Sequence, residues 1–181
     1  MSVLLETKRL ILRPPKAGDI GQFLPLISDF DVSKNLSRVP HPYTEDDACD
    51  FIVRMNAGWA SGEDLVFAIL RKPDGAYIGT CGLHPARGHE FGYWIGKPYW
   101  RSGYATEAAT RLIAFAFEEK GVEKLTAKWF HDNPASGRVL EKLRCRPAGE
   151  EYSNCLARGY KVAAHVVVLD RTTYMTRKMG A

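Results

Sequence analysis

Trp100-Arg101-Ser102-Gly103-Tyr104-Ala105-Thr106 leads directly into the most regular helical pattern in the chain. In that pattern, small and apolar residues recur every three or four positions, which predicts a helix with one buried face. These residues are Ala105, Ala108, Ala109, Leu112, Ile113 and Ala116. Gly121 stands where the helix should end. The quoted segment therefore brings the chain into the N-terminus of a helix.

The same segment has the features of an anion-binding site. Gly103 allows the backbone to approach a ligand closely, and the first N–H groups of a helix have no partner within it. With the positive end of the helix dipole they can hold a pyrophosphate, to which Arg101 could add a charge. A glycine before a helix is also common in ordinary turns, so the segment alone leaves both interpretations open. The chain contains neither GxxxxGK followed by Ser or Thr nor GxGxxG, which argues against the usual nucleotide loops.

The residues before this segment predict antiparallel strands. Residues 65–70 and 77–83 flank Pro73-Asp74-Gly75, a turn sequence that should fold them into a hairpin. Glu90–Ile95 continues as a third antiparallel strand. Nearer the N-terminus, Leu10–Arg13 reads as a short strand.

Two helices are expected between the short strand and the hairpin. The first has its apolar residues at helical spacing, and Pro25 should kink or shorten it. These residues are Ile20, Phe23, Leu24 and Ile27. In the second, Thr44 can cap the N-terminus, and the three acidic residues after it suit the positive end of the helix dipole. The acidic residues are Glu45, Asp46 and Asp47, and the apolar stripe is Ala48, Phe51, Ile52 and Met55.

Elements of both kinds follow the central helix. Residues 122–130 read as a strand, and residues 134–143 as a helix with Asn133 as its cap. Two further strands are expected near residues 150–154 and 163–169. The chain is therefore predicted to mix α and β elements.

Length and composition predict a single domain over residues 1–181. The chain is 45% hydrophobic and 25% charged, so it can bury one sizeable core, and it has no repeat or low-complexity linker. Its four cysteines are widely spaced and form no CxxC pair, which argues against a zinc cluster or a disulfide framework. They are Cys49, Cys81, Cys145 and Cys155.

Charge and hydropathy exclude further classes of protein. The formal net charge of +4 comes from 25 basic and 21 acidic residues, which is too mild and too mixed to indicate a nucleic-acid surface but is compatible with an anionic small ligand. Glu6, Lys8 and Arg9 leave no apolar run of signal-peptide length, and no later stretch approaches the ~20 residues that span a bilayer. We therefore expect a soluble, cytoplasmic protein that binds neither nucleic acid nor membranes.

Two segments together resemble the acetyl-CoA-binding core of the GNAT superfamily of N-acetyltransferases. They are WRSGYATEA at residues 100–108 and NPASGRVLEKL at residues 133–143, and they are similar to the ribosomal-protein N-terminal acetyltransferase-like (RimJ/RimL-like) branch. LETKRLILRP at residues 5–14 and PYTEDDACDFI at residues 42–52 also resemble that branch. The pieces keep the family's order from about residue 5 to about residue 169.

The resemblance implies an α+β fold of the GNAT type. Its mixed, mostly antiparallel and twisted sheet has about seven strands and about four flanking helices, and it splays open between its fourth and fifth strands. Here those strands would be Glu90–Ile95 and residues 122–130. The pantetheine arm of acetyl-CoA would lie in the split.

The resemblance also assigns residues to the coenzyme. The backbone from Arg101 to Thr106 would hold the pyrophosphate. That stretch comprises Arg101, Ser102, Gly103, Tyr104, Ala105 and Thr106. Asn133 and Ser136 would contact the pantetheine and thioester end, and Trp94 and Ile95 would flank the acetyl group. No metal ligand is implied.

The chain departs from the family pattern at two places. Ser102 stands where a basic residue is common before the key glycine, and Arg144-Cys145 stand where the family often has Gly-Phe. A left-handed cap costs a residue other than glycine roughly 1–2 kcal/mol. We therefore expect the helix before Arg144 to end without a positive φ at that residue.

Acetyl transfer to nitrogen requires a neutral amine, stabilisation of an oxyanion, and a proton for the departing thiolate. Glu90 is the first candidate for the base, working through water, because strand alternation places it on one face with Trp94 beside the implied split. It could equally be a solvated surface carboxylate. His89 is the second candidate for the base.

Ser136 occupies the family position nearest the sulfur, so it could protonate the thiolate, although it could equally be a first-turn capping serine. The five histidines fall in different segments without metal-ligand spacing, so each is expected to be a surface or hydrogen-bonded polar residue. They are His41, His84, His89, His131 and His165.

The resemblance leaves the amine acceptor open between protein N-termini, which the branch favours, and small amines. Two other classes remain as alternatives, namely a module that senses acetyl-CoA without transferring the acetyl group and a phosphate-binding protein for another nucleotide. The sequence carries no prediction of the oligomeric state.

Overall fold

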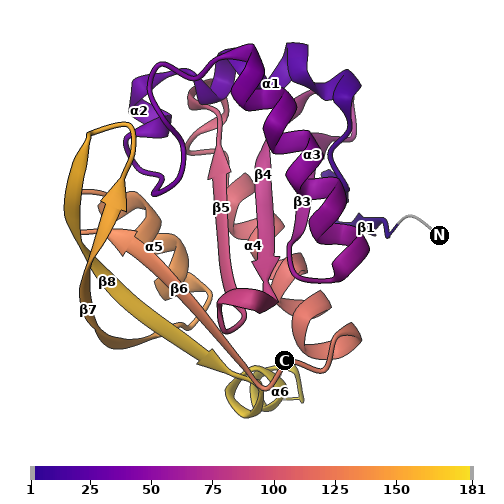
Figure 1. Cartoon of the computed structure of the whole chain (residues 1–181). Helices are drawn as coiled ribbons and strands as arrows, with labels where there is room; N and C mark the ends of the chain where they lie inside the picture. Colours follow the sequence, from indigo (N-terminus) through magenta and orange to yellow (C-terminus); the bar gives the residue numbers. More distant parts are fainter. Residues whose placement is uncertain (1–2, 180–181) are drawn as a thin grey trace.

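The computed structural model describes residues 3–179, and these contain a sheet of eight strands with helices on both faces (Figure 1). Neighbouring strands are antiparallel except for β5 and β6, which are parallel. The order across the sheet is β1-β2-β3-β4-β5-β6-β8-β7. The strands are β1 Leu5–Glu6, β2 Leu10–Arg13, β3 Leu65–Arg71, β4 Tyr77–His84, β5 Glu90–Ile95, β6 Lys124–Phe130, β7 Arg146–Cys155 and β8 Tyr160–Asp170.

The helices form one layer on each face of the sheet. In Figure 1, α1 and α3 lie in front of the central strands, and α4 and α5 lie behind them. The bounds are α1 Ile20–Ile27, α2 Phe30–Ser33, α3 Glu45–Ser61, α4 Tyr104–Ala114, α5 Pro134–Lys142 and α6 Arg171–Met179. None of the helices in the described part of the chain is both long enough and apolar enough to cross a membrane. The architecture confirms the predicted α+β fold.

The sequence explains the best-defined elements. Thr44 and Asp47 form a reciprocal capping box at the start of α3, as the Thr44 cap predicted. The turn between β3 and β4 places Gly75 at a φ of 67°, a conformation that glycine adopts without strain. The helical spacing of the small residues in α4 buries Ala108 and Leu112 against the sheet.

The sheet splays open between β5 and β6. In the described part of the chain these two strands pair at a single register position, Glu90 with Thr126. Beyond it they diverge, and Figure 1 shows β6 leaning away from β5. β6 pairs with β8 along its whole length, so β6, β8 and β7 form a separate arm of the sheet. The predicted split therefore lies between the expected strands.

Three short or terminal elements were not predicted, namely β1, α2 and α6. β1 contains two residues and α2 contains four, which is too short for a periodic pattern to show. α1 is eight residues long and contains Pro25, as expected for a shortened helix. In α6, Tyr174 lies against Phe117, with the ring centroids 5.0 Å apart, and joins the C-terminal helix to the core.

The prediction for Arg144 was wrong. Arg144 has a φ of 66° directly after the C-cap of α5. Its N–H donates to Glu141 O at 2.9 Å, and the N–H of Cys145 donates to Leu140 O at 3.0 Å. These two bonds form a Schellman motif, which satisfies the last carbonyls of the helix and offsets the cost of the left-handed conformation.

Candidate active site

The segment before α4 presents free backbone N–H groups to solvent. Arg101 and Gly103 both have left-handed backbones, with φ angles of 61° and 80°, and Gly103 is the N-cap of α4. Glu107 N–H makes the first helical bond, to Gly103 O at 3.1 Å, so the N–H groups of residues 104–106 have no acceptor within the helix. Gly103 has no side chain that could cap them. The predicted anion-binding segment therefore has an exposed helix N-terminus of the required kind.

Arg9, between β1 and β2, fixes this segment in place. Its Nη1 donates to Ser102 O at 3.0 Å, and its Nε donates to Glu107 Oε2 at 2.6 Å. The guanidinium also lies over the Tyr104 ring, 4.5 Å from its centroid. A Cβ atom at Gly103 would lie 3.4 Å from Arg9 Nη2, so the arginine borders the turn directly. Sequence analysis quoted Arg9 within a family-like segment but gave it no role.

Glu107 secures the N-terminal strands to α4. Its Oε1 accepts hydrogen bonds from the Thr7 hydroxyl at 2.6 Å and from the Arg9 N–H at 2.9 Å. Burial by itself raises the pKa of Glu107, but the hydrogen bonds from Thr7 and Arg9 outweigh it and lower that pKa overall. The carboxylate therefore stays ionised and holds Arg9 beside the segment.

The edge of β5 that faces β6 carries backbone groups that β6 does not reach. The Thr126 N–H donates to His89 O at 3.3 Å, which places the odd-numbered residues of β5 with their backbone toward β6. Beyond that contact, the N–H and C=O of Tyr93 and the N–H of Ile95 point into the split. The Ile95 C=O accepts from Trp100 Nε1 at 2.6 Å.

Trp94 and Ile95 lie on opposite faces of β5. Ile95 packs with the core under α4, and Trp94 packs on the α1 side, with its ring centroid 6.4 Å from that of Tyr77. The two residues predicted to flank the acetyl group therefore border the same stretch of strand from two sides.

Ser136 and Tyr93 form a hydroxyl pair across the split. Ser136 Oγ lies 3.0 Å from Tyr93 Oη, and Tyr93 Oη also donates to Ser136 O at 3.3 Å. Burial raises the pKa of Tyr93 well above its usual range, so the phenol stays protonated. Asn133 Oδ1 accepts from the Ser136 N–H at 3.3 Å and caps α5, as predicted. Sequence analysis missed Tyr93, whose position on the α5 face follows from strand alternation.

The Ser136 turn is held close to β6 by a glycine. A Cβ atom at Gly137 would lie 2.9 Å from Trp129 Cζ2, so only a residue without a side chain lets α5 sit on that indole. Asn133, Ser136 and Gly137 together fix the first turn of α5 against the β6 arm.

Glu90 lies at the closed end of the split and is paired with a lysine. Lys128 Nζ lies 3.2 Å from Glu90 Oε2 and 2.9 Å from Glu151 Oε1. Burial lowers the pKa of Lys128, but its contacts with the two carboxylates outweigh burial and raise that pKa, so the ammonium stays charged. Two carboxylates around one ammonium leave one net negative charge. Glu90 remains 25% exposed and can reach water.

The predicted site residues do not form one compact cluster. Glu90 and Ile95 stand at the two ends of β5, which at about 3.3 Å per residue separates them by about 17 Å. The N-terminus of α4 follows the Ile95 end, and Tyr93 lies between the two ends. An elongated ligand along β5 would touch all three regions.

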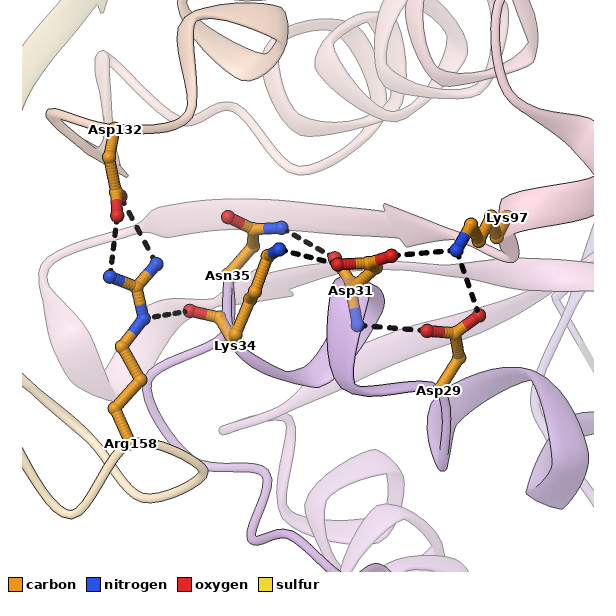
Figure 2. Close-up of polar contacts among 7 residues, drawn as sticks. All are labelled: Asp29, Asp31, Lys34, Asn35, Lys97, Asp132 and Arg158. Atoms are coloured by element: carbon orange, nitrogen blue, oxygen red, sulfur yellow. Dashed lines mark hydrogen bonds and ion pairs between the residues drawn. The ribbon is translucent and has the colours of Figure 1, made fainter.

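The segment of residues 28–37, which contains α2 and which we call the strap, passes over the open end of the split. On the β5 side, Lys97 Nζ lies 2.6 Å from Asp31 Oδ2 and 3.8 Å from Asp29 Oδ2 (Figure 2). Asp29 also caps α2 by accepting the Asp31 N–H at 2.8 Å. These contacts tie the strap to the residues that follow β5.

The other end of the strap is held by the β7–β8 turn. Figure 2 shows Arg158 between the strap and Asp132. Its Nε donates to Lys34 O at 2.8 Å, and its Nη1 lies 2.6 Å from Asp132 Oδ2. Leu156 N–H adds a bond to Ser37 O at 3.3 Å. The strap therefore joins the β5 side of the split to the β6–β8–β7 arm.

Comparisons with known proteins agree with this geometry. Residues 9–146 match the family model described as an acetyltransferase (GNAT) domain. The uncharacterised N-acetyltransferase YoaA of Bacillus subtilis (strain 168) is 29% identical over 153 residues, covering 82% of this chain and 86% of YoaA.

Two solved structures share the fold. An acetyltransferase (GNAT family) from Bacillus anthracis superposes with a TM-score of 0.80 at 23% identity, covering 94% of this chain and 99% of that one. RimL, a ribosomal L7/L12 α-N-protein acetyltransferase in complex with coenzyme A, superposes with a TM-score of 0.79 at 14% identity, covering 94% and 99%. At these identities the superpositions support the fold rather than a shared substrate.

Proposed function

Because the chain belongs to the GNAT family of acetyltransferases, we propose that it uses acetyl-coenzyme A to acetylate a primary amine, with the α-amine of a protein or peptide N-terminus as acceptor. The observation that carries this proposal is the exposed N-terminus of α4 at one end of the split, with Arg101 and Gly103 turning the chain so that its N–H groups are free. Such groups and the helix dipole suit a diphosphate.

The residues along β5 fit an extended coenzyme. The backbone N–H groups from Gly103 to Thr106 would hold the pyrophosphate, with Arg9 at the side of the turn. The unpaired N–H and C=O groups of β5 suit the amide groups of a pantetheine arm. When bound, acetyl-CoA supplies the activated acetyl group as a thioester.

Glu90 would take a proton from the amine through water. Tyr93 is the third residue after Glu90, and at about 3.3 Å per step the two lie about 10 Å apart along the strand, which excludes direct contact with a group at Tyr93. Glu90 and Tyr93 lie on opposite faces of β5. An acceptor could therefore approach from the Glu90 face while the thiol is protonated from the other.

Ser136 and Tyr93 supply the proton for the departing thiolate. The Ser136 hydroxyl would protonate the thiolate, the Tyr93 phenol would pass its proton to Ser136 through the 3.0 Å contact, and solvent would return a proton to Tyr93. A free thiol has a pKa of about 8.5, so the thiolate is a good leaving group and needs only a modest contribution from a hydroxyl proton donor.

Acid–base energetics favour an α-amine as acceptor. Deprotonating an α-amine at pH 7 costs roughly 1 kcal/mol, whereas a lysine amine costs about 4.6 kcal/mol. A single carboxylate that acts through water suits the easier of these two deprotonations. The net negative charge of Glu90, Glu151 and Lys128 also favours the approach of a cationic amine.

A thiol-release assay tests the proposal. Each reaction contains the protein, acetyl-CoA and one class of amine. The amines are peptides with free N-termini, the same peptides blocked at the N-terminus, polyamines, and amino acids. We expect turnover with the free N-termini and none with the blocked peptides. Turnover with small amines but not with peptides would show that the acceptor is a small amine. The absence of thiol release with every amine would refute the enzymatic proposal.

The variant Glu90→Gln tests the base in the same assay. Loss of a general base typically lowers the rate by about 10²–10⁴-fold, while the binding of coenzyme should be unchanged. Calorimetric titration with coenzyme A provides that control. A variant with wild-type turnover would remove Glu90 from the mechanism.

A further inference from the structure

Three strands of the β6–β8–β7 arm bring two histidines and a glutamate together. Glu150 on β7 and Trp129 on β6 are both register partners of His165 on β8, so the three side chains share a face. His131 follows β6 directly, and its N–H donates to Ala163 O at 3.0 Å, which extends the pairing by one residue.

The donor atoms of these residues lie close to one another. His165 Nδ1 lies 3.3 Å from Glu150 Oε1, and His131 Nε2 lies 3.5 Å from the same oxygen. All three donor atoms lie within 4.8 Å of one another. Charge-assisted N–H···O bonds are usually about 2.7–2.9 Å long, so both contacts are longer than a strong hydrogen bond.

The spacing matches a tetrahedral transition-metal site. Zinc binds histidine nitrogen and carboxylate oxygen at about 2.0–2.2 Å, and tetrahedral geometry then places neighbouring donor atoms about 3.3–3.6 Å apart. The two measured separations, 3.3 Å and 3.5 Å, fall in that range. Two imidazoles and one carboxylate favour zinc, cobalt or nickel over calcium or magnesium, which prefer oxygen donors.

Ring stacking holds the two imidazoles in this arrangement. The rings of His131 and His165 are stacked with centroids 3.9 Å apart and an interplanar angle of 18°. The Trp129 ring lies on the His165 ring, with centroids 4.3 Å apart. Packing therefore keeps the two rings side by side. Because the lone pairs of stacked imidazoles run nearly parallel, the rings must tilt toward each other to bind one ion.

We infer that His131, Glu150 and His165 bind a divalent transition-metal ion, zinc best, with solvent completing the coordination. The side chains of all three are partly exposed, at 40%, 65% and 35%, so an ion can enter from solvent. His131 lies two residues before Asn133, so the ion would clamp the β6–α5 turn to β7 and β8. The site is separate from acetyl transfer and takes no part in its chemistry.

Calorimetric titration tests the inference on tag-free protein that has been treated with chelator and then exchanged into chelator-free buffer. Zinc chloride should bind with one ion per chain, and cobalt(II) should give the visible absorption of a tetrahedral ion with nitrogen and oxygen ligands. His131→Ala and His165→Ala should each weaken zinc binding by more than roughly 10-fold, since even changes to outer-shell partners cost about 10–100-fold. His41→Ala removes an exposed histidine elsewhere and should bind zinc as the wild type does.

Glu150→Gln keeps the side-chain shape on an exposed position and serves as the second variant if a histidine variant folds poorly. Zinc should raise the melting temperature of the wild type and of His41→Ala, but not that of Glu150→Gln. Wild-type protein that binds no zinc at one ion per chain, or a His41→Ala variant that loses as much affinity as His131→Ala, would overturn the inference. Both readouts are independent of acetyl transfer.

Discussion

The Ser136–Tyr93 pair joins α5 to β5 through hydroxyl groups alone. The Tyr93 phenol remains protonated, so it can pass a proton to Ser136 after Ser136 has protonated the thiolate, and a proton from solvent then restores Tyr93. The same contact also steadies the first turn of α5. Kinetic measurements separate these two roles, because a proton donor acts on turnover whereas a structural contact acts on folding.

Ser136→Ala should lower kcat by roughly 10–100-fold while coenzyme affinity changes by less than about 2-fold, since the lost group acts in the reaction rather than in binding. Tyr93→Phe keeps the ring packing and should give a smaller loss of kcat. Tyr152→Phe, at an exposed tyrosine on β7, is the matched control. If Ser136→Ala lowers the melting temperature and the activity together, the role of Ser136 is to cap the helix.

Residue-level prediction from the sequence depended on whether a residue belongs to a recognisable motif. Asn133 and Ser136 were named because they stand in the segment NPASGRVLEKL, which resembles the family, and the Asn133 cap is confirmed. Tyr93 was not predicted because its partner Ser136 lies 43 positions away in the sequence. Arg9 was missed because its partners, Ser102 and Glu107, lie more than ninety positions away in the sequence.

At the scale of elements, the turn before α4 depends on a residue from a different part of the chain. Arg9 contacts the backbone of the turn, the carboxylate of Glu107 and the ring of Tyr104 at once. Its removal should leave the helix folded but its first turn less well fixed. The free N–H groups would then have to be ordered when a ligand binds.

Arg9→Met should therefore weaken coenzyme A binding by about 10-fold, which corresponds to about 1.4 kcal/mol. Lys8→Met is the control, because it removes an exposed charge next to Arg9. Calorimetry on both variants measures the difference, and the salt dependence of each affinity separates general charge effects from the local one. Equal affinities for the two variants would show that Arg9 does not fix the site.

The strap contributes to stability in a pH-dependent way. Hydrogen bonds from Lys34 and Lys97 lower the pKa of Asp31 from 3.8 to about 2. A carboxylate whose pKa is lowered by folding stabilises the folded state above its unfolded pKa, and the contribution disappears as the pH falls through the folded pKa. Stabilisation by Asp31 is therefore present at neutral pH and is lost between about pH 4 and pH 2.

Denaturant unfolding of Asp31→Asn and wild type at several pH values checks this expectation. The wild type should be slightly more stable at pH 7, because exposed ion pairs contribute little, and the difference should close toward pH 2. Asp46→Asn, on the exposed first turn of α3, is the control. A stability gap that stays constant down to pH 2 would contradict the role of the ion pairs.

Apolar periodicity in the sequence predicts the long helices but not the short helix α2 or the end of α5. α3 and α4 carry apolar stripes and both were predicted, α3 with Thr44 as its cap. The predicted end of the central helix at Gly121 differs from the structure, because α4 ends at Ala114 and a π-helical turn follows over Phe115–Glu119. α2 is held by ion pairs from distant elements instead of by its own four residues. The end of α5 was mispredicted because the cost of a left-handed Arg144 was weighed without the two hydrogen bonds that offset it.

For the whole molecule, the split divides one sheet into two parts that are joined at Glu90 and Thr126 and bridged by the strap. This arrangement could not be deduced from strand patterns, because pairing between β5 and β6 depends on residues that are distant in sequence. It followed from the resemblance of two short segments to a family, and the fold confirms it. The acceptor and the roles of Glu90 and Ser136 remain predictions.

A ligand along β5 should stabilise the folded protein by linking both parts. Coenzyme A at 100 times its dissociation constant should add about 2.7 kcal/mol to the free energy of unfolding. Adenosine 3′,5′-diphosphate, which lacks the pantetheine arm, should raise the melting temperature less at equal concentration. Hydrogen exchange at residues 91–95 should slow when coenzyme A is bound but not when adenosine 3′,5′-diphosphate is bound. Equal protection by both ligands would place the arm outside the split.

The outer borders of the sheet have a consequence for the behaviour of the protein in concentrated solution. Unpaired strand edges promote aggregation by recruiting strands from other molecules. Here one border is the two-residue β1, and the other is β7, which carries Pro147, a register shift between Pro147 and Gly149, and the charged Glu150 and Glu151. The unpaired stretch of β5 beyond Glu90 faces β6 inside the fold. The molecule thus keeps an open strand for a ligand without offering it to neighbouring chains.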